Sequence, residues 1–190
     1  TDLASLTIYV VKVGPLERVL TECVGLESFE FGRDVIPRMM NQFKVCGFEF
    51  GGYWAYARTI DAYYQATQDL ILGRIDLDAW DVRTNLQDSG VAAAPPLKIG
   101  SSAEIRNSLI SAGCTIEGTV RGSVLSPGVH VARGAIVEGS IVFQRSSLSE
   151  GSRIERAIID KDVRIGAASR VGGPGLIGVE THPGSPTEMG

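Results

Sequence analysis

Hydrophobic and polar residues follow a fixed period in the second half of the chain. Three successive 17-residue stretches, 124–140, 141–157 and 158–174, align on one another without gaps. Aliphatic residues recur at the same places and form three columns: Leu125, Val142 and Ile159; Val131, Leu148 and Ile165; and Val137, Ile154 and Val171. Within each stretch an aliphatic residue recurs about every six positions. The residues between the aliphatic ones are mostly Gly, Ser, Ala and Asp. This pattern predicts a triangular parallel β-helix with three short strands per coil.

One coil of this kind could not fold alone. Burying an aliphatic side chain contributes roughly 1.5–3 kcal/mol, whereas ordering the backbone costs roughly 1–2 kcal/mol per residue. We therefore expect several coils to stack in register around one continuous core. Residues 97–105 supply an earlier coil, and the coil that begins at Leu109 is two residues short, which predicts a trimmed corner near Gly118. A β-sandwich is the alternative, but the strict columns disfavour it.

The first 73 residues have a different pattern. The apolar, β-branched run Leu6–Val13 predicts a buried strand, and residues 44–50 predict a second one. Apolar residues at helical spacing predict helices over 15–23, 32–40 and 59–73. Thr59 is placed to cap the last of these helices, which ends at Gly73. Because two strands cannot close a sheet with its own core, we interpret this region as a piece of a larger α/β domain.

The composition excludes several classes of function. The chain has 190 residues, a net charge of −4 and no basic run, so we expect no nucleic-acid partner and no anionic membrane surface. Its three cysteines have no CxxC spacing, which disfavours a metal site or a disulfide framework and favours a reducing cytoplasm. We expect an α/β part over 1–73, a connector over 74–98, the β-helix over 99–174 and a weakly ordered Gly/Pro-rich tail over 175–190.

Several motifs together resemble one enzyme family. The motifs FGRDVIPRM (31–39) and GYWAYARTIDAYYQATQDLI (52–71) resemble the end of the catalytic domain of ADP-glucose pyrophosphorylase, also called glucose-1-phosphate adenylyltransferase. The family patterns there are approximately FGKDIIP and YWRDVGTIDAYYEANMDLL. The repeats, including SVLSPGVHV (123–131) and RAIIDKDVRIG (156–166), resemble its left-handed β-helix. The resemblance, over residues 3 to about 171, therefore implies part of a Rossmann-like nucleotidyltransferase domain followed by a left-handed β-helix of hexapeptide repeats.

The resemblance also implies a reaction. The family makes ADP-glucose and pyrophosphate from ATP and glucose 1-phosphate for glycogen and starch synthesis, with Mg²⁺ at the phosphates. Its Gly-rich nucleotide loop, phosphate-binding basic residues and one metal-binding Asp belong to an amino-terminal half that this sequence lacks. We therefore expect a carboxy-terminal portion that binds no Mg²⁺ and catalyses nothing by itself. The missing half also decides which nucleotide base is used.

The resemblance suggests two sugar-contact residues. Ser5 lies in ASLTIYVV, which matches ASMGIYVF in the family, where the Ser contacts glucose; Thr7 replaces the usual Gly. Trp54 matches the aromatic residue of YWRDVGT beside the sugar site. The alternatives are a strand-end hydroxyl for Ser5 and a packing aromatic for Trp54.

Tyr56 departs from the family at an important position. It stands where the family has an Asp that binds the catalytic Mg²⁺, and a neutral phenol offers no hard anionic oxygen to that ion. Ala57 and Arg58 replace the usual Val and Gly, and Arg58 adds a cation nearby. These departures favour a parent protein that is catalytically weakened or silent, as a regulatory or partner subunit.

The family also binds regulatory anions and forms homo- or hetero-tetramers. Asp160 and Lys161 match a segment that helps bind such anions in plant-type members; the alternative is a solvated corner. In the connector, Arg83, Thr84 and Asn85 are further candidates. The sequence does not identify the effector.

Two other classes share features of this chain. Hexapeptide acyltransferases use a catalytic His on the β-helix, but strand alternation places His130 on the outer surface if Val131 points inward. Other sugar-phosphate nucleotidyltransferases also have β-helices, although the YW and DAYYQA segments favour the ADP-glucose type. A purely structural role in assembly is the third possibility.

Overall fold

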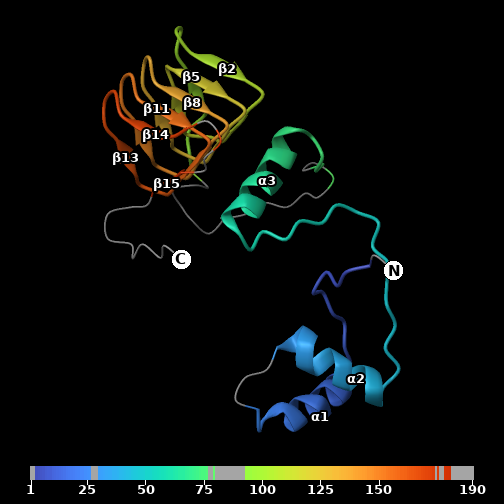
Figure 1. Ribbon diagram of the computed structural model, residues 1–190. Coiled ribbons are helices and arrows are strands. Elements are labelled where there is room, and N and C mark those ends of the chain that lie inside the picture. Colours follow the sequence, from blue (N-terminus) through green and yellow to red (C-terminus); the bar gives the residue numbers. More distant parts are fainter. Residues whose placement is uncertain are drawn as a thin grey trace. The chain divides into compact units, whose positions relative to one another are not determined.

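The computed structural model describes residues 3–26, 30–76, 79, 93–173, 175 and 178–180. The chain divides into two compact units, Thr1–Trp54 and Ala55–Gly190 (Figure 1). Each unit has its own core. The connector candidates Arg83, Thr84 and Asn85, and most of the expected Gly/Pro-rich tail, lie outside the described residues.

The first unit is built from short helices. They are α1 (Val13–Cys23), the π-helix η1 (Phe31–Val35) and α2 (Ile36–Gln42). Pro37 stands in the first turn of α2, where a missing N–H costs nothing. The core consists of Val19, Cys23, Val35 and Met39. The helices expected over 15–23 and 32–40 are thus confirmed, and the second of them opens with a π-helical turn.

The two strands expected in this unit are not formed among the described residues. The segments before α1 and after α2 contain no hydrogen-bonded strand, and several of their apolar side chains are exposed: Val10 is 101% exposed, Ile8 76% and Phe48 89%. An apolar run becomes a strand only when a neighbouring strand completes its hydrogen bonds. No such neighbour occurs among residues 3–26 and 30–54, so this part is helical and not the expected α/β layer.

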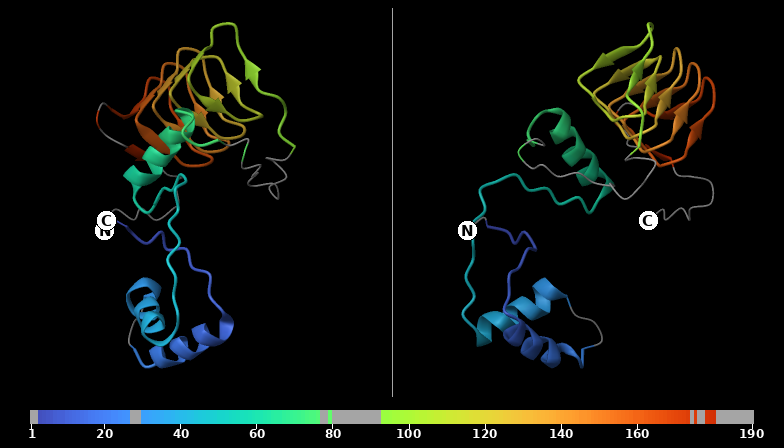
Figure 2. Two further views of the ribbon diagram at one scale, coloured as in Figure 1. Left: turned by 90° about the vertical axis from the view of Figure 1, so that its right-hand side faces the viewer. Right: turned by 180° about the vertical axis from the view of Figure 1, so that it is seen from behind.

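The second unit contains the parallel β-helix, as expected. Sheet A contains β1 (Lys98–Ile99), β4 (Thr115–Ile116), β7 (His130–Val131), β10 (Ser147–Leu148) and β13 (Arg164–Ile165). Sheet B contains β2 (Glu104–Arg106), β5 (Thr119–Arg121), β8 (Ile136–Glu138), β11 (Arg153–Glu155) and β14 (Arg170–Gly172). Sheet C contains β3 (Leu109–Ile110), β6 (Val124–Leu125), β9 (Ile141–Val142), β12 (Ala157–Ile159) and β15 (Gly178–Glu180). Figure 2 shows the stacked coils from two further sides.

The three aliphatic columns point into the core in the expected register. In sheet C, Leu125 pairs with Val142, and Val142 pairs in turn with Ile159. The other two columns pair in the same way in sheets A and B. Most of these side chains are fully buried, and the last coil is slightly more open at Ile165, which is 7% exposed. The 17-residue spacing of aliphatic residues in the sequence is therefore the spacing of the buried core residues from one coil to the next.

The trimmed corner near Gly118 is also confirmed. Two residues, Glu117 and Gly118, connect β4 to β5, whereas four residues, 132–135, make the same connection in the next coil. A Cβ atom on Gly118 would collide with the carbonyl oxygens of Ala132 and Ala135. The short corner therefore lies against the longer one, and only glycine fits between them.

A ladder of serines stabilises the corner between sheets B and C. The Oγ of Ser123 donates to the carbonyl of Arg121 (2.8 Å) and accepts from the N–H of Ser140 (3.0 Å). Ser140 repeats this arrangement with Glu138 (2.8 Å) and the N–H of Ala157 (3.2 Å). Both serines are fully buried, so each satisfies backbone groups that water cannot reach.

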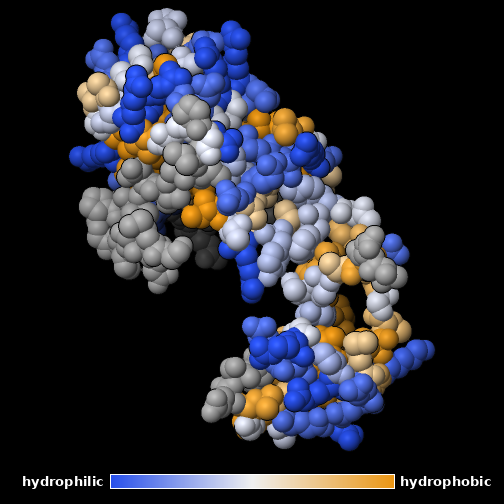
Figure 3. Space-filling view, viewed as in Figure 1, coloured by the Kyte–Doolittle hydropathy of each residue, from blue (hydrophilic) through white to orange (hydrophobic). Residues whose placement is uncertain are grey.

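The helix α3 (Ile60–Ile71) belongs to the second unit and lies on sheet C (Figures 1 and 2). Thr59 caps it as expected, because its side chain accepts the N–H of Ala62 at 3.1 Å. Tyr64, which is 6% exposed, packs with Ile141 and Ile158 on the outer side of the sheet. Elsewhere the face of the β-helix seen in Figure 3 is largely hydrophilic.

Candidate functional site

Ser5 lies in the first unit near a strained backbone position. Its exposed hydroxyl is 3.1 Å from the Tyr9 hydroxyl and accepts the N–H of Thr7 at 3.2 Å. Thr7 has φ +59°, which a β-branched residue rarely adopts. The family pattern has Gly at this position, and a left-handed backbone explains that preference. The contact of Ser5 with a sugar stays a prediction.

Trp54 ends the first unit, and Tyr56 lies at the beginning of the second. Both side chains are about two-fifths exposed, at 40% and 42%. The Arg58 guanidinium lies 5.3 Å from the centre of the Tyr56 ring, and its backbone N–H donates to the Tyr56 carbonyl at 2.9 Å. Trp54 and Tyr56 are therefore accessible aromatic groups that precede α3 in the sequence, and Tyr56 has a cation at its ring.

These residues do not fit the Mg²⁺ ion that the family uses. Mg²⁺ requires hard oxygen ligands, usually carboxylates, and Tyr56 with the Arg58 cation beside it offers none. Within the described part of the chain, no three His, Cys, Asp or Glu side chains are grouped to hold a metal.

Asp160 and Lys161 lie at the corner between β12 and β13. The Oδ1 of Asp160 accepts the N–H of Lys161 at 2.8 Å, and its carbonyl accepts the hydroxyl of Ser146 at 2.6 Å. The Lys161 side chain is exposed. The structure thus brings the two residues together in a turn, and their role with regulatory anions stays a prediction.

Beside this turn, the structure adds an ion pair that the sequence did not suggest. Arg145 donates through Nε and one terminal nitrogen to both carboxylate oxygens of Asp162, at 2.6 and 2.8 Å. Both residues have φ near +60° at equivalent corners of adjacent coils. The signal in the sequence is their 17-residue separation, which equals one coil.

His130 points outward from β7, as strand alternation predicts. Its side chain is exposed, whereas the following residue Val131 is fully buried. In sheet A its neighbours above and below are Thr115 and Ser147. His130 therefore lies on an open polar face of the β-helix.

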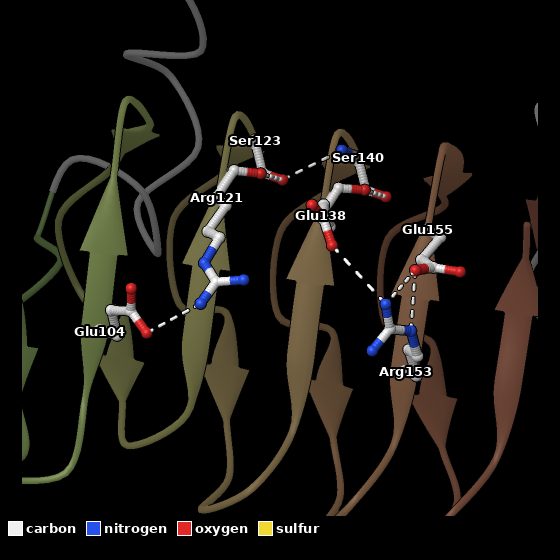
Figure 4. A network of polar contacts seen from close by, with 7 residues as sticks. All are labelled: Glu104, Arg121, Ser123, Glu138, Ser140, Arg153 and Glu155. Carbon is white, nitrogen blue, oxygen red and sulfur yellow. Dashed lines mark hydrogen bonds and ion pairs between the residues drawn. The ribbon is translucent and has the colours of Figure 1, made fainter. Parts of the chain in front are cut away.

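Sheet B has a row of ion pairs on its outer side (Figure 4). Glu104 pairs with Arg121 at 2.9 Å and with Arg106 at 2.7 Å, and Arg153 pairs with Glu155 and, at 3.7 Å, with Glu138. The hydrogen bond from Arg121 lowers the pKa of Glu104, and that from Arg153 lowers the pKa of Glu155. Since the charges pair within the sheet, they stabilise the face and leave little net charge on it.

The joint between α3 and the β-helix centres on Tyr64. Its hydroxyl donates to the carbonyl of Gly139 at 2.6 Å, and the Arg156 guanidinium lies 5.3 Å from the ring centre. Burial raises the pKa of Tyr64, which keeps the hydroxyl protonated as a donor. The sequence gives no sign of these partners, which lie 75 or more residues away from Tyr64.

Comparison with known proteins agrees with this architecture. A family model described as "GlmU-like, C-terminal hexapeptide" matches residues 92–174. The glucose-1-phosphate adenylyltransferase of Acetivibrio thermocellus is 31% identical over 90% of this chain and 41% of its own length. That of Desulfitobacterium hafniense is 33% identical over 90% of this chain and 44% of its own length, and that of Clostridium botulinum 36% identical over 74% and 37%.

The chain is similar over most of its length to the carboxy-terminal portion of glucose-1-phosphate adenylyltransferases. The hexapeptide match fits a left-handed β-helix over residues 92–174. The match to the adenylyltransferases is longer and extends into the helical unit. The chain spans about two-fifths of the length of these curated relatives. Among the described residues, no helix is both long and apolar enough to cross a membrane.

Proposed function

We propose that this chain is the carboxy-terminal part of a glucose-1-phosphate adenylyltransferase-type protein of glycogen synthesis. In this proposal its β-helix serves assembly and allosteric regulation. The support comes from the stacked parallel coils together with relatives of that name aligned over 90% of the chain. The intact protein would convert ATP and glucose 1-phosphate to ADP-glucose and pyrophosphate. We infer a reducing cytoplasm as its location, since the described cysteines Cys23, Cys46 and Cys114 are free.

The test is an assay of the intact protein that contains this chain. ADP-glucose formation from ATP and glucose 1-phosphate would support the proposal, with UTP, GTP and dTTP as controls for the base. Preference for another nucleotide would assign the protein to a different sugar nucleotidyltransferase. Binding of an acyl-CoA in place of sugar phosphate would favour an acyltransferase in which His130 is the catalytic histidine.

A second candidate is a catalytically silent subunit, and Tyr56 is the observation that favours it. The phenol and the Arg58 cation 5.3 Å from its ring stand where the family binds Mg²⁺ through Asp. A silent subunit would still assemble with an active one into a homo- or hetero-tetramer and bind effectors. This candidate predicts little ADP-glucose formation by the intact protein alone.

The substitution Tyr56→Asp separates the two candidates. Restored Mg²⁺-dependent turnover would show that one lost ligand silenced the protein, whereas Tyr56→Phe, the matched control, should stay inactive. Turnover of the unchanged protein comparable to that of an ordinary family member would rule out the silent subunit. Sedimentation analysis of the same samples measures the proposed tetramer.

The individual site residues are part of the proposal. Ser5 and Trp54 would contact glucose 1-phosphate, and Asp160 and Lys161 would take part in binding regulatory anions. Ser5→Ala and Trp54→Ala should raise the KM for glucose 1-phosphate, whereas Lys161→Gln should change only the response to sugar-phosphate or inorganic phosphate effectors. An unchanged KM and an unchanged effector response in all variants would show that these residues have purely structural roles.

A further inference from the structure

The contact of α3 with the β-helix depends on one aromatic side chain that has three kinds of partner. Tyr64 packs on the apolar side chains of Ile141 and Ile158 in sheet C. Its hydroxyl donates to the carbonyl of Gly139 at 2.6 Å. The face of its ring meets the guanidinium of Arg156 at 5.3 Å, within the range of a cation–π interaction. The helix is therefore attached to two successive coils at once.

Arg156 occupies a backbone conformation that disfavours an arginine. Its φ is +46°, and the equivalent corner residues of the two preceding coils are Gly122 at +54° and Gly139 at +53°. Glycine adopts this conformation without a steric penalty, whereas a residue with a Cβ does not. The corner itself therefore does not need an arginine. The side-chain contact with Tyr64 explains why one is present.

The segment attached through this contact leads directly to Tyr56. Residues Ala55–Thr59 belong to the same compact unit as the β-helix, and Thr59 caps the first turn of α3. Fixing the helix therefore also fixes the point from which the preceding segment extends. If α3 moved on sheet C, Tyr56 and Arg58 would move with it.

We infer that Tyr64 and Arg156 form a latch by which the β-helix positions the segment Ala55–Thr59, which directly follows the proposed sugar contact Trp54 in the chain, so that both act as positioning residues for sugar-phosphate binding. This inference rests on the proposed function for its last step. The latch itself rests only on the contacts of the second unit. The β-helix thus has a role in arranging a substrate-side segment, beyond assembly.

Hydrogen exchange of the full chain, resolved over residues 55–71, tests the latch. Arg156→Gly removes the cation but leaves a residue suited to the corner, so the coil should stay folded. Exchange in α3 should become about three- to tenfold faster, the range expected for losing an exposed to partly desolvated cation–π contact. Tyr64→Phe should act in the same direction, and Arg156→Lys should restore most of the protection.

Ala168→Gly is the matched control. Ala168 has φ +55° at a corner between sheets A and B, away from sheet C, so this variant relieves the same kind of strain without touching α3. It should leave exchange in residues 55–71 unchanged. Equal exchange rates in Arg156→Gly, Ala168→Gly and the unchanged chain would overturn the latch.

The positioning role is tested by kinetics or binding in the intact protein. Arg156→Gly should raise the KM or Kd for glucose 1-phosphate several-fold with a smaller change in kcat, and Arg156→Lys should reverse this. Faster exchange with unchanged KM and Kd would overturn the positioning role while leaving the latch in place. Absence of glucose 1-phosphate binding by the unchanged protein would refute the proposed function and the positioning role together, and the exchange comparison would still decide the latch.

Discussion

The two units differ in how they bury their apolar segments. In the β-helix every aliphatic column meets its copy one coil away, and the core residues are buried with almost no exposure. In the helical unit the apolar segments on either side of α1 and α2 form no strand, and several of their side chains are exposed, as at Val10 and Phe48. A repeat supplies its own neighbours, whereas a run of apolar residues in a mixed domain depends on partners from elsewhere in the chain. The same apolar residue types therefore contribute differently to the stability of the two units.

The largest effect should come from the core of the β-helix. Leu148→Ala removes a fully buried side chain and should lower the free energy of unfolding by about 2–5 kcal/mol. The matched change in the helical unit, Val10→Ala, truncates a fully exposed side chain and should change it by less than about 0.5 kcal/mol. Urea denaturation followed by circular dichroism measures both, and similar effects would break the contrast between the units.

The trimmed corner should show the next largest effect. Gly118→Ala should cost about 1–3 kcal/mol, because its Cβ would press on two carbonyl oxygens of the longer corner. Gly47→Ala is the control in the first unit, since a Cβ there meets nothing within 4 Å. A neutral Gly118→Ala in the same denaturation experiment would show that the corner can shift.

The serine ladder should also contribute measurably. Ser140→Ala removes an acceptor from the N–H of Ala157, a fully buried residue, and should cost about 1–3 kcal/mol. Ser101→Ala, at an exposed corner of the first coil, should be close to neutral. Equal thermal midpoints for the two variants would mean that water replaces the lost acceptor.

A smaller effect of opposite sign is expected at Ala168. Glycine suits its φ of +55° better than alanine does, so Ala168→Gly should stabilise the β-helix by up to about 1 kcal/mol. The neighbouring Ala167→Gly has no such strain to relieve and should destabilise slightly. Calorimetry of both variants gives the sign, and a lower Tm for Ala168→Gly would contradict this account of the corners.

The smallest effect should be a dependence on pH from sheet B. Pairing with Arg121 lowers the pKa of Glu104 in the folded chain. The pair therefore stabilises the fold above the ordinary carboxyl pKa, and this contribution is lost as the pH falls through the lowered value. Arg121→Gln should flatten the stability profile below the ordinary glutamate pKa, which is about 4.3. An identical profile in the variant would show that solvent screens the pair completely.

The sequence predicted the β-helix more completely than the helical unit for a physical reason. The columns at Leu125, Val131 and Val137 repeat locally, so their register and even the two-residue deletion at Gly118 could be read from spacing alone. The helices α1, α2 and α3 were also predictable from periodicity and from the Thr59 cap. Strands over 6–13 and 44–50 were not, because strand formation depends on a neighbour that periodicity does not reveal.

The candidate site shows the same limit. The sequence, through a resemblance, pointed to Tyr56 as a departure from a metal ligand, and the structure adds the Arg58 cation over its ring. It could not have pointed to Arg156, because its partner Tyr64 lies 92 positions earlier and only the fold brings the two together. The positive φ at Thr7 and Arg156 is likewise a property of the backbone that the residue type opposes.

The uniform register of the β-helix has a consequence for how this protein could change in length. Since each coil contacts only its neighbours, duplicating residues 141–157 would insert one more coil without disturbing the columns on either side, and would lengthen the stack by about 4.8 Å. An insertion of another size within a strand would shift the following strands out of register, whereas a corner can absorb a small change, as the two-residue connection at Gly118 does. The length of the β-helix can therefore change in steps of one coil, and natural or engineered variants should differ in length by whole numbers of coils.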